Sequence, residues 1–268
     1  MVKRENAGMS GTISFQVDGA LARVELANPS KRNALDIAMW RELRRIFDVL
    51  QAMPEAEAPR VVIVSGAGGQ FASGGDIVEF AGFRFNELAL RDFHENVVAP
   101  ALHAMLACDI PVLAQIDGAC IGGGFEIAAC CDIRICGASS RFGAPIAKLG
   151  FPMAPAELAV LARITSGPVL REMLLEARLF DAERAWQLGL VNAVVADADL
   201  AQHVLDRAEA IAALSAPAAR LNKRSLRQLA HGGASAAQRH EHFGYADSPD
   251  HREGIAAFIA KRPPNFSS

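Results

Sequence analysis

Apolar positions near the N-terminus first alternate with polar ones and then recur at helical spacing. Residues 12–17 and 21–26 form two short strand-like runs around Asp18-Gly19, and this arrangement is a strong hairpin signal. Asp36 follows a polar loop and is a suitable N-cap for a helix that we expect to continue to Gln51. Apolar side chains at helical spacing predict one buried face for this helix: Ile37, Trp40, Leu43, Phe47 and Leu50.

Short apolar runs then alternate with helical patterns. We expect strands at residues 60–65, 111–116 and 131–136, of which the first is β-branched enough to be buried on both faces. Between them, a helix is expected from about Asn86 to Ala107, with a bend at Pro100. Because strands and helices alternate, the pattern predicts a mainly parallel sheet layered with helices.

The pattern changes in the last part of the chain. From Pro155 onward the strand signal nearly vanishes, apart from residues 190–195, and helical patterns dominate. The last helix, around residues 252–260, is expected to stop before Pro263-Pro264. We therefore expect an α/β core in residues 1–200 and a helical region in residues 201–268.

Composition and charge exclude several classes of protein. The chain of 268 residues is 51% hydrophobic and 21% charged, which favours a folded domain over disorder. Its net charge of -3, with basic residues scattered among acidic ones, offers no electrostatic field for nucleic acid. No apolar stretch reaches the length of a membrane span or a signal-peptide core, so we expect a cytoplasmic protein without a membrane partner.

The cysteines and histidines do not suggest a metal site. The seven histidines are dispersed, and the cysteines lie in apolar segments without the paired spacing of zinc ligands. We therefore expect no bound metal and buried free thiols at all five cysteines: Cys108, Cys120, Cys130, Cys131 and Cys136.

A glycine triplet is the most informative stretch of the sequence. In AQIDGACIGGGFEIAACCDI an apolar run ends at a turn, and Gly122 to Gly124 lead into a short apolar helix that contains Glu126. The first N–H groups of a helix have no internal partner and lie at the positive end of its dipole. Gly123 and Glu126 are one helical turn apart, which pairs a bare backbone donor with a carboxylate. This pairing could stabilise an enolate oxygen while a proton moves nearby.

A second glycine-rich loop, GAGGQFASGG at residues 66–75, has the same surroundings. It lacks the GxGxxG pattern of a dinucleotide loop, and Phe71 stands where a GxSxG nucleophile motif around Ser73 would need glycine. Both loops follow a buried strand, contain glycines at their ends and open a helix. Their backbones could therefore face one another across one site.

Six colinear segments together give the chain a resemblance to a known family. They are NPSKRNAL, VIVSGAGGQFASGGDI, PVLAQIDGACIGGGFEIAACCDIRI, RFGAPIAKLG, AERAWQLGLVNAVV and EGIAAFIAKRPPNF. In these segments the sequence resembles the crotonase superfamily, the enoyl-CoA hydratase/isomerase group. The resemblance implies a ββα spiral core with a C-terminal helical trimerisation region, assembly as a homotrimer or dimer of trimers, and an acyl-CoA or enoyl-CoA substrate. Coenzyme A then enters as part of the substrate, and no separate cofactor is expected.

The resemblance also implies roles for particular residues. Two backbone amides that form the family's oxyanion hole fall on Gly75 and Gly123. Residues matched to positions that bind the substrate are Lys31 and Arg32 at the CoA phosphates, Ser73, Gly75, Asp76 and Ile77 in the adenine loop, and Phe258 and Lys261 near the nucleotide from a neighbouring subunit.

The match is incomplete at the catalytic carboxylates. Glu126 corresponds to the first glutamate of the hydratases, but Ile146 stands where the second glutamate follows proline. Glu157 occupies a position where the family usually has glycine. Its carboxylate could point into the pocket as a second acid/base, or it could face solvent at the start of a helix.

Several functions stay open on these residues. The preferred interpretation is an enoyl-CoA hydratase/isomerase-type enzyme that holds a thioester enolate and uses Glu126 as acid/base. The alternatives are a CoA-thioester hydrolase or decarboxylase of the same superfamily, or a catalytically silent CoA-thioester binding subunit.

Overall fold

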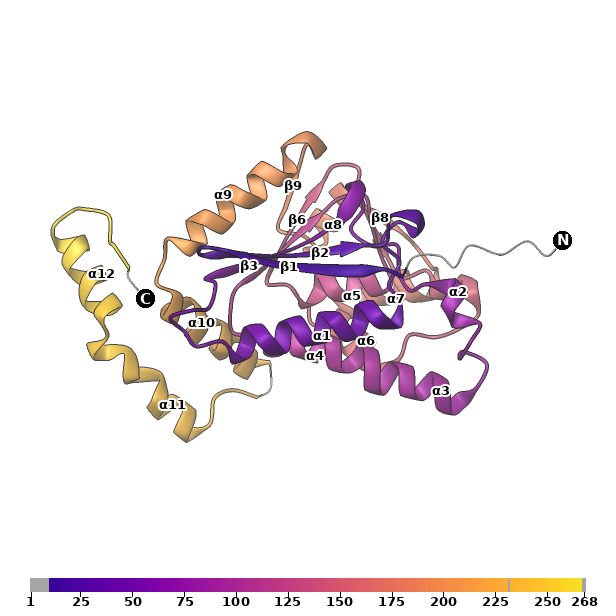
Figure 1. Cartoon of the computed structure of the whole chain (residues 1–268), viewed down its shortest axis with the longest axis horizontal. Helices are drawn as coiled ribbons and strands as arrows, with labels where there is room; N and C mark the ends of the chain where they lie inside the picture. The colour runs from indigo at the N-terminus through magenta and orange to yellow at the C-terminus, as the bar shows by residue number, and fades with distance from the viewer. Residues whose placement is uncertain (1–9, 231, 267–268) are drawn as a thin grey trace.

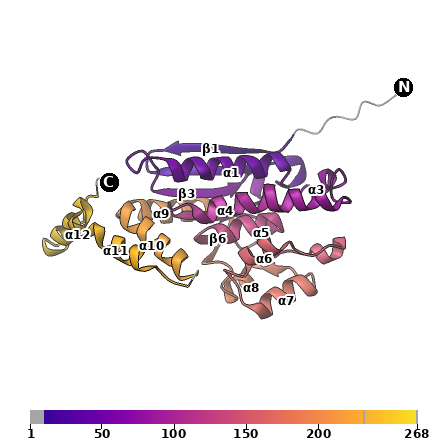
Figure 2. The same cartoon turned by 90° about the horizontal axis from the view of Figure 1, so that it is seen from below.

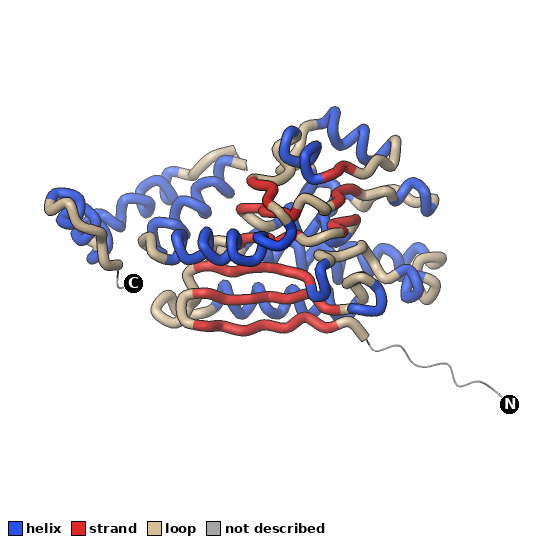
Figure 3. Tube along the Cα trace, turned by 90° about the horizontal axis from the view of Figure 1, so that it is seen from above, coloured by secondary structure: helices blue, strands red, loops and turns tan. Residues whose placement is uncertain are grey.

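A mainly parallel sheet forms the centre of the computed structural model, which describes residues 10–230 and 232–266. Parts of the expected regions, namely residues 1–9, 231 and 267–268, lie outside the described residues. The sheet has six strands in the order β1-β2-β3-β4-β6-β9, and all pairs except β1-β2 are parallel (Figures 1 and 3). Their bounds are β1 Thr12–Asp18, β2 Leu21–Ala27, β3 Val61–Gly66, β4 Val112–Ile116, β6 Ile133–Gly137 and β9 Ala193–Val195.

The expected hairpin and parallel sheet are confirmed, and several strand boundaries differ by one or two residues. β1 and β2 each extend one residue beyond the predicted runs. The strand expected from residue 131 begins only at Ile133. The reason is local, because the Cys131 N–H still donates to the Ala128 carbonyl and closes the preceding helix, α5 (Gly123–Cys130).

A second, smaller sheet was not predicted. It has the order β5-β7-β8, with β5 Ala119–Ile121, β7 Arg141–Gly143 and β8 Phe180–Asp181. Strands of two or three residues are too short to show an alternating pattern. This sheet matters for the site because β5 leads directly into the glycine triplet.

Helices cover both faces of the main sheet (Figures 1 and 2). α1 (Ile37–Ala52), capped by Asp36 as expected, and α4 (Ala99–Ala107) lie against one face, where the large hydrophobic core forms. α9 (Leu200–Ala212) covers the other face and buries Val204 against Ile63 and its neighbours. The site therefore rests on a sheet that is packed on both sides.

The long helix expected from residue 86 has an irregular centre. It runs as α3 (Glu87–Asp92), a π-helical turn η3 (Phe93–Val98) and α4. Pro100 has no N–H to donate to the preceding turn, and the Ala99 N–H donates five residues back, to the His94 carbonyl. The predicted irregularity is thus a π turn that ends next to Pro100, and it carries His94.

Helices dominate the C-terminal part of the chain, as expected. α11 and α12 extend away from the sheet (Figures 1 and 2). Among the described residues, no helix is long and apolar enough to cross a membrane. The remaining helices are α2 Ile77–Phe80, α6 Pro155–Leu161, α7 Gly167–Leu175, α8 Ala182–Gln187, α10 Ala216–Leu229, α11 Ala236–His242 and α12 Pro249–Ile259.

Candidate active site

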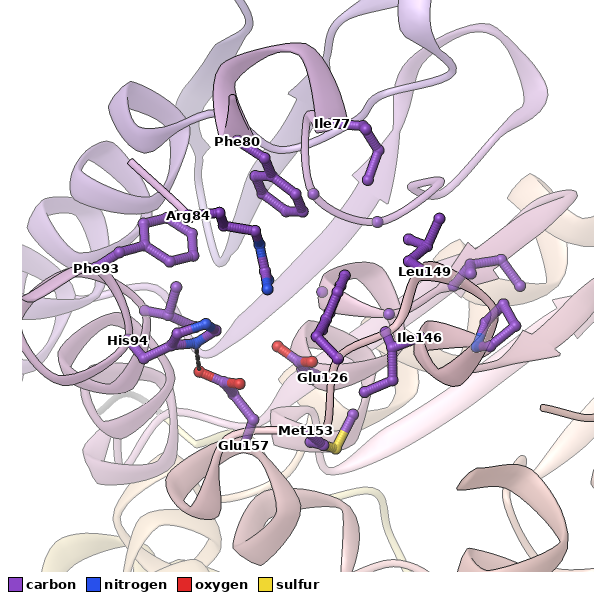
Figure 4. A pocket seen from close by; sticks show the side chains of 18 of the residues that line it. Ile77, Phe80, Arg84, Phe93, His94, Glu126, Ile146, Leu149, Met153 and Glu157 are labelled. Carbon is purple, nitrogen blue, oxygen red and sulfur yellow. Dashed lines mark hydrogen bonds and ion pairs between the residues drawn. The ribbon is translucent and has the colours of Figure 1, made fainter. Parts of the chain in front are cut away.

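One cavity collects both glycine loops and both candidate carboxylates (Figure 4). Its wall comes from the two loops, α2, the π turn η3, the start of α6 and a short 3-10 helix, η4 (Ile146–Leu149). Apart from a few polar groups the lining is apolar and aromatic, as in most small-molecule sites.

The first loop presents a free backbone donor at Gly75. Leu35 and Gly75 form an isolated parallel bridge, in which the Gly74 carbonyl and the Asp76 N–H make both hydrogen bonds to Leu35. The N–H of Gly75 therefore points to the opposite side, and it has no backbone partner among the described residues. A Cβ at this position would lie 2.5 Å from the Phe80 ring, so any other residue would require that ring to move.

Each glycine of the triplet is favoured for a different local reason, either its backbone conformation or a close neighbour. Gly122 has a φ of 51° and a ψ of -120°, which side chains disfavour. A Cβ on Gly123 would meet Trp40 at 2.8 Å, and one on Gly124 would lie 2.7 Å from the Ala72 carbonyl oxygen. Gly123 is the first residue of α5, so its N–H has no partner within the helix.

Hydrogen bonds hold the two loops together. The Ala72 N–H donates to the Ala119 carbonyl, and the Ile121 N–H donates to the Ala72 carbonyl. These bonds join the first loop to β5, immediately before the triplet. Gly75 and Gly123 consequently both line the same cavity, which is the arrangement that the sequence predicted.

Glu126 lines this cavity one turn into α5, and its side chain is buried. Burial raises the pKa of its carboxyl group well above the usual value, and the nearby charge of Glu157 raises it further, whereas Arg84 lowers it. A glutamate that only favoured the helix dipole would face water. Its burial beside a free backbone donor instead fits a group that exchanges a proton with a bound ligand.

Glu157 turns into the cavity and not toward solvent. Its side chain is buried in the first turn of α6, and its Oε1 lies 2.7 Å from Nδ1 of His94 (Figure 4). The solvent-facing alternative is therefore excluded by the fold. His94 could not be predicted as a partner of Glu157 from the sequence, since it comes from the π turn, 63 residues earlier in the chain.

Ile146 lies in the cavity wall as the first residue of η4, on the opposite side from His94 (Figure 4). No carboxylate reaches the cavity from η4. The second carboxylate that lines the cavity, Glu157, comes from α6 instead.

The residues matched to CoA-binding positions gather around the first loop. Lys31 Nζ lies 2.5 Å from Asp76 Oδ2, and Asp76 caps α2 by accepting from the Val78 N–H. The Ser73 hydroxyl donates to the Lys31 carbonyl, and the Ser73 N–H donates to the Arg32 carbonyl. Ser73 and the half-exposed Ile77 line the cavity, whereas Lys31 and Arg32 do not.

Phe258 and Lys261 do not join this cluster within one chain. Phe258 is 84% exposed near the end of α12, and Lys261 is exposed just after it. α12 lies at the opposite end of the molecule from α2 and α3 (Figures 1 and 2). These two residues can reach a cavity of this kind only on another copy of the chain.

Two further observations concern the cysteines and possible metal ligands. The five cysteines are buried and free, as expected. Among the described residues, no group of three or more His, Cys, Asp or Glu side chains is placed to hold a metal ion.

Comparison with known proteins identifies the family to which the chain belongs. The model of the enoyl-CoA hydratase/isomerase family matches residues 16–268. A probable enoyl-CoA hydratase of Rhizobium meliloti is 31% identical over 95% of this chain and 97% of its own length. The mitochondrial enoyl-CoA hydratase domain-containing protein 3 of Homo sapiens is 31% identical over 96% of this chain and 83% of its own.

Solved structures agree with the family. An enoyl-CoA hydratase/carnithine racemase of Magnetospirillum magneticum superposes with a TM-score of 0.90 at 40% identity, covering 95% of this chain and 94% of that one. An enoyl-CoA hydratase of Bacillus anthracis gives 0.84 at 28% identity, covering 95% and 98%. On these matches and on its fold, the chain belongs to the enoyl-CoA hydratase/isomerase family of the crotonase superfamily.

Proposed function

We propose that the protein is an acyl-CoA thioester enzyme of the enoyl-CoA hydratase/isomerase type. The observation that carries this proposal is the convergence of two unpaired glycine N–H groups and Glu126 on one apolar cavity. The N–H groups of Gly75 and Gly123 would donate to the thioester oxygen and stabilise the enolate that forms there. Coenzyme A is part of the substrate, and no other cofactor is needed for this chemistry.

The two carboxylates suggest a division of roles in hydration. Glu157, oriented by His94, takes a proton from water, and the resulting hydroxide attacks the β-carbon of the enoyl thioester. The enolate then collapses as Glu126 gives its proton to the α-carbon. The raised pKa of Glu126 supports this role, because it favours the protonated form of the carboxyl group before the reaction. The proton taken by Glu157 returns to Glu126 between turnovers, so protons balance.

A panel of thioesters tests the proposal. The purified protein is incubated with enoyl-, 3-hydroxyacyl- and branched acyl-CoA esters, and the products are followed by mass and by the absorbance of the conjugated thioester. We expect gain or loss of one water, or a shift of the double bond without a mass change. Release of free CoA would indicate a hydrolase, and loss of carbon dioxide a decarboxylase. Binding without turnover of any ester would favour the silent binding subunit and contradict an enzyme.

We also propose that the protein assembles as a homotrimer or a dimer of trimers. The extended C-terminal helices expose a set of large apolar side chains that one chain leaves uncovered: Leu226, Leu229, Phe243, Ile255, Phe258 and Ile259. Apolar faces of this extent are typical of subunit interfaces. Light scattering at micromolar concentration is expected to give three or six times the mass of the chain. A stable monomer would contradict the assembly.

A further inference from the structure

Arg84 is the one lysine or arginine among the described residues that line the cavity. It follows α2, where its backbone N–H donates to the Phe80 carbonyl. Its guanidinium stacks on two aromatic rings, 4.2 Å from the centroid of Phe80 and 3.7 Å from that of Phe151. Figure 4 shows the side chain pointing into the cavity, on the side of Glu126 and Glu157. The rings therefore fix a cation in an otherwise apolar wall.

The guanidinium has no polar partner in the described part of the chain. Its Nε is buried and unbonded, and neither carboxylate of the cavity is within ion-pair distance of Arg84. A partly buried cation without hydrogen bonds is costly, and proteins normally pair such groups. Burial lowers the pKa of Arg84, which is the direction expected when this cost is not offset by a close partner.

The charges around Arg84 compensate its own charge only in part, because neither nearby carboxylate contacts the guanidinium. Glu126 holds its proton more strongly than an ordinary glutamate, because of burial first and Glu157 second. The Glu157 carboxylate is hydrogen-bonded to the imidazole of His94. Neither acid is therefore a full counter-ion for the guanidinium. A negative group on the ligand would supply the missing direct ion pair.

The competing explanation is that Arg84 serves only to balance Glu126 and Glu157. Both carboxylates do act on Arg84 through space. However, a permanent counter-ion would be expected to make a direct, bidentate contact with one of them. The structure instead holds Arg84 against Phe80 and Phe151 and leaves its donors facing the space where the acyl group would lie.

We propose that the substrate's acyl chain carries a second carboxylate and that Arg84 binds it. The substrate is then the CoA monothioester of a dicarboxylic acid, with the thioester oxygen on the N–H groups of Gly75 and Gly123. This inference rests on the proposed function, since it assumes that a CoA thioester occupies the cavity. It narrows the substrate class to acyl groups that are anionic at the end remote from sulfur.

Binding of saturated, unreactive thioesters tests this without turnover. Succinyl-, glutaryl- and adipoyl-CoA are each compared with the analogue in which the terminal carboxylate is a neutral amide of the same shape, by titration calorimetry. We expect at least one acid to bind about 10- to 100-fold tighter than its amide, as a charge-assisted hydrogen bond gives. Arg84→Met keeps an aliphatic chain between the rings and should abolish that difference while the amide binds as before.

The controls separate the possible outcomes. Arg91→Met removes an exposed arginine of α3 that pairs with Glu87, and it should keep the preference for the acid. Arg84→Lys keeps the charge without the planar fork and should retain part of the preference; it also serves if the methionine variant does not fold. Equal binding of acids and amides by the wild type, or equal weakening of both in Arg84→Met, would overturn the inference. If the amides still bind, a CoA thioester does occupy the cavity and only the role of Arg84 is overturned; if no thioester binds at all, the proposed function fails as well.

Discussion

Glu126→Gln is expected to lower kcat about 10²- to 10⁴-fold on any thioester that the wild type converts. General acid/base groups contribute rate factors of this size, and glutamine keeps the shape of the side chain without a proton to exchange. The binding of an unreactive acyl-CoA should change little, because the N–H groups of Gly75 and Gly123 remain. Steady-state kinetics on the best ester of the panel gives the rate. Wild-type kcat in the folded variant would contradict a proton-transfer role.

Thermal unfolding provides the control for this variant. The pKa of Glu126 is raised in the folded protein, so its contribution to stability is fully present below the usual glutamate value and is lost as the pH rises through the folded pKa. Glutamine has no such dependence. The variant should therefore be at least as stable as the wild type near neutral pH, with the advantage growing as the pH increases. A less stable variant would mean that lost activity reflects damage to the fold.

The parts of the fold that the sequence predicted well are those with a long periodic signal. α1 shows this, since its apolar stripe and its Asp36 cap are both visible in the sequence and both occur in the structure. The strands of the small sheet show the opposite. β5, β7 and β8 have two or three residues each, and they form only because neighbouring segments place them together.

The residues of the candidate site likewise fall into those that the sequence could predict and those that it could not. Gly123 and Glu126 could be found because helical spacing is a property of a short stretch, whereas Gly75 was singled out within its loop only by the family resemblance. His94 and Arg84 could not, because their importance depends on elements that meet only after folding.

Glu157 lies between these two cases. The sequence showed that it starts a helix, which leaves two directions for its carboxylate. The packing of α6 against α5 and the π turn is what directs the Glu157 carboxylate into the cavity. An i to i+3 relation can thus be read from one segment, whereas the direction of a single side chain at a helix start depends on what the helix packs against.

Glu157→Gln is expected to lower the rate of hydration about 10²- to 10⁴-fold if this residue activates water. Glu95→Gln is the matched control, because Glu95 lies in the same π turn as His94 but is exposed. The pH profile gives a second readout. Glu157 raises the pKa of Glu126, so its removal lowers that pKa, and any residual activity that needs protonated Glu126 should disappear at a lower pH than in the wild type. A shifted profile with an unchanged maximal rate would show that Glu157 acts only through its charge, and Glu126 would then be the sole proton shuttle, as in an isomerase-type reaction.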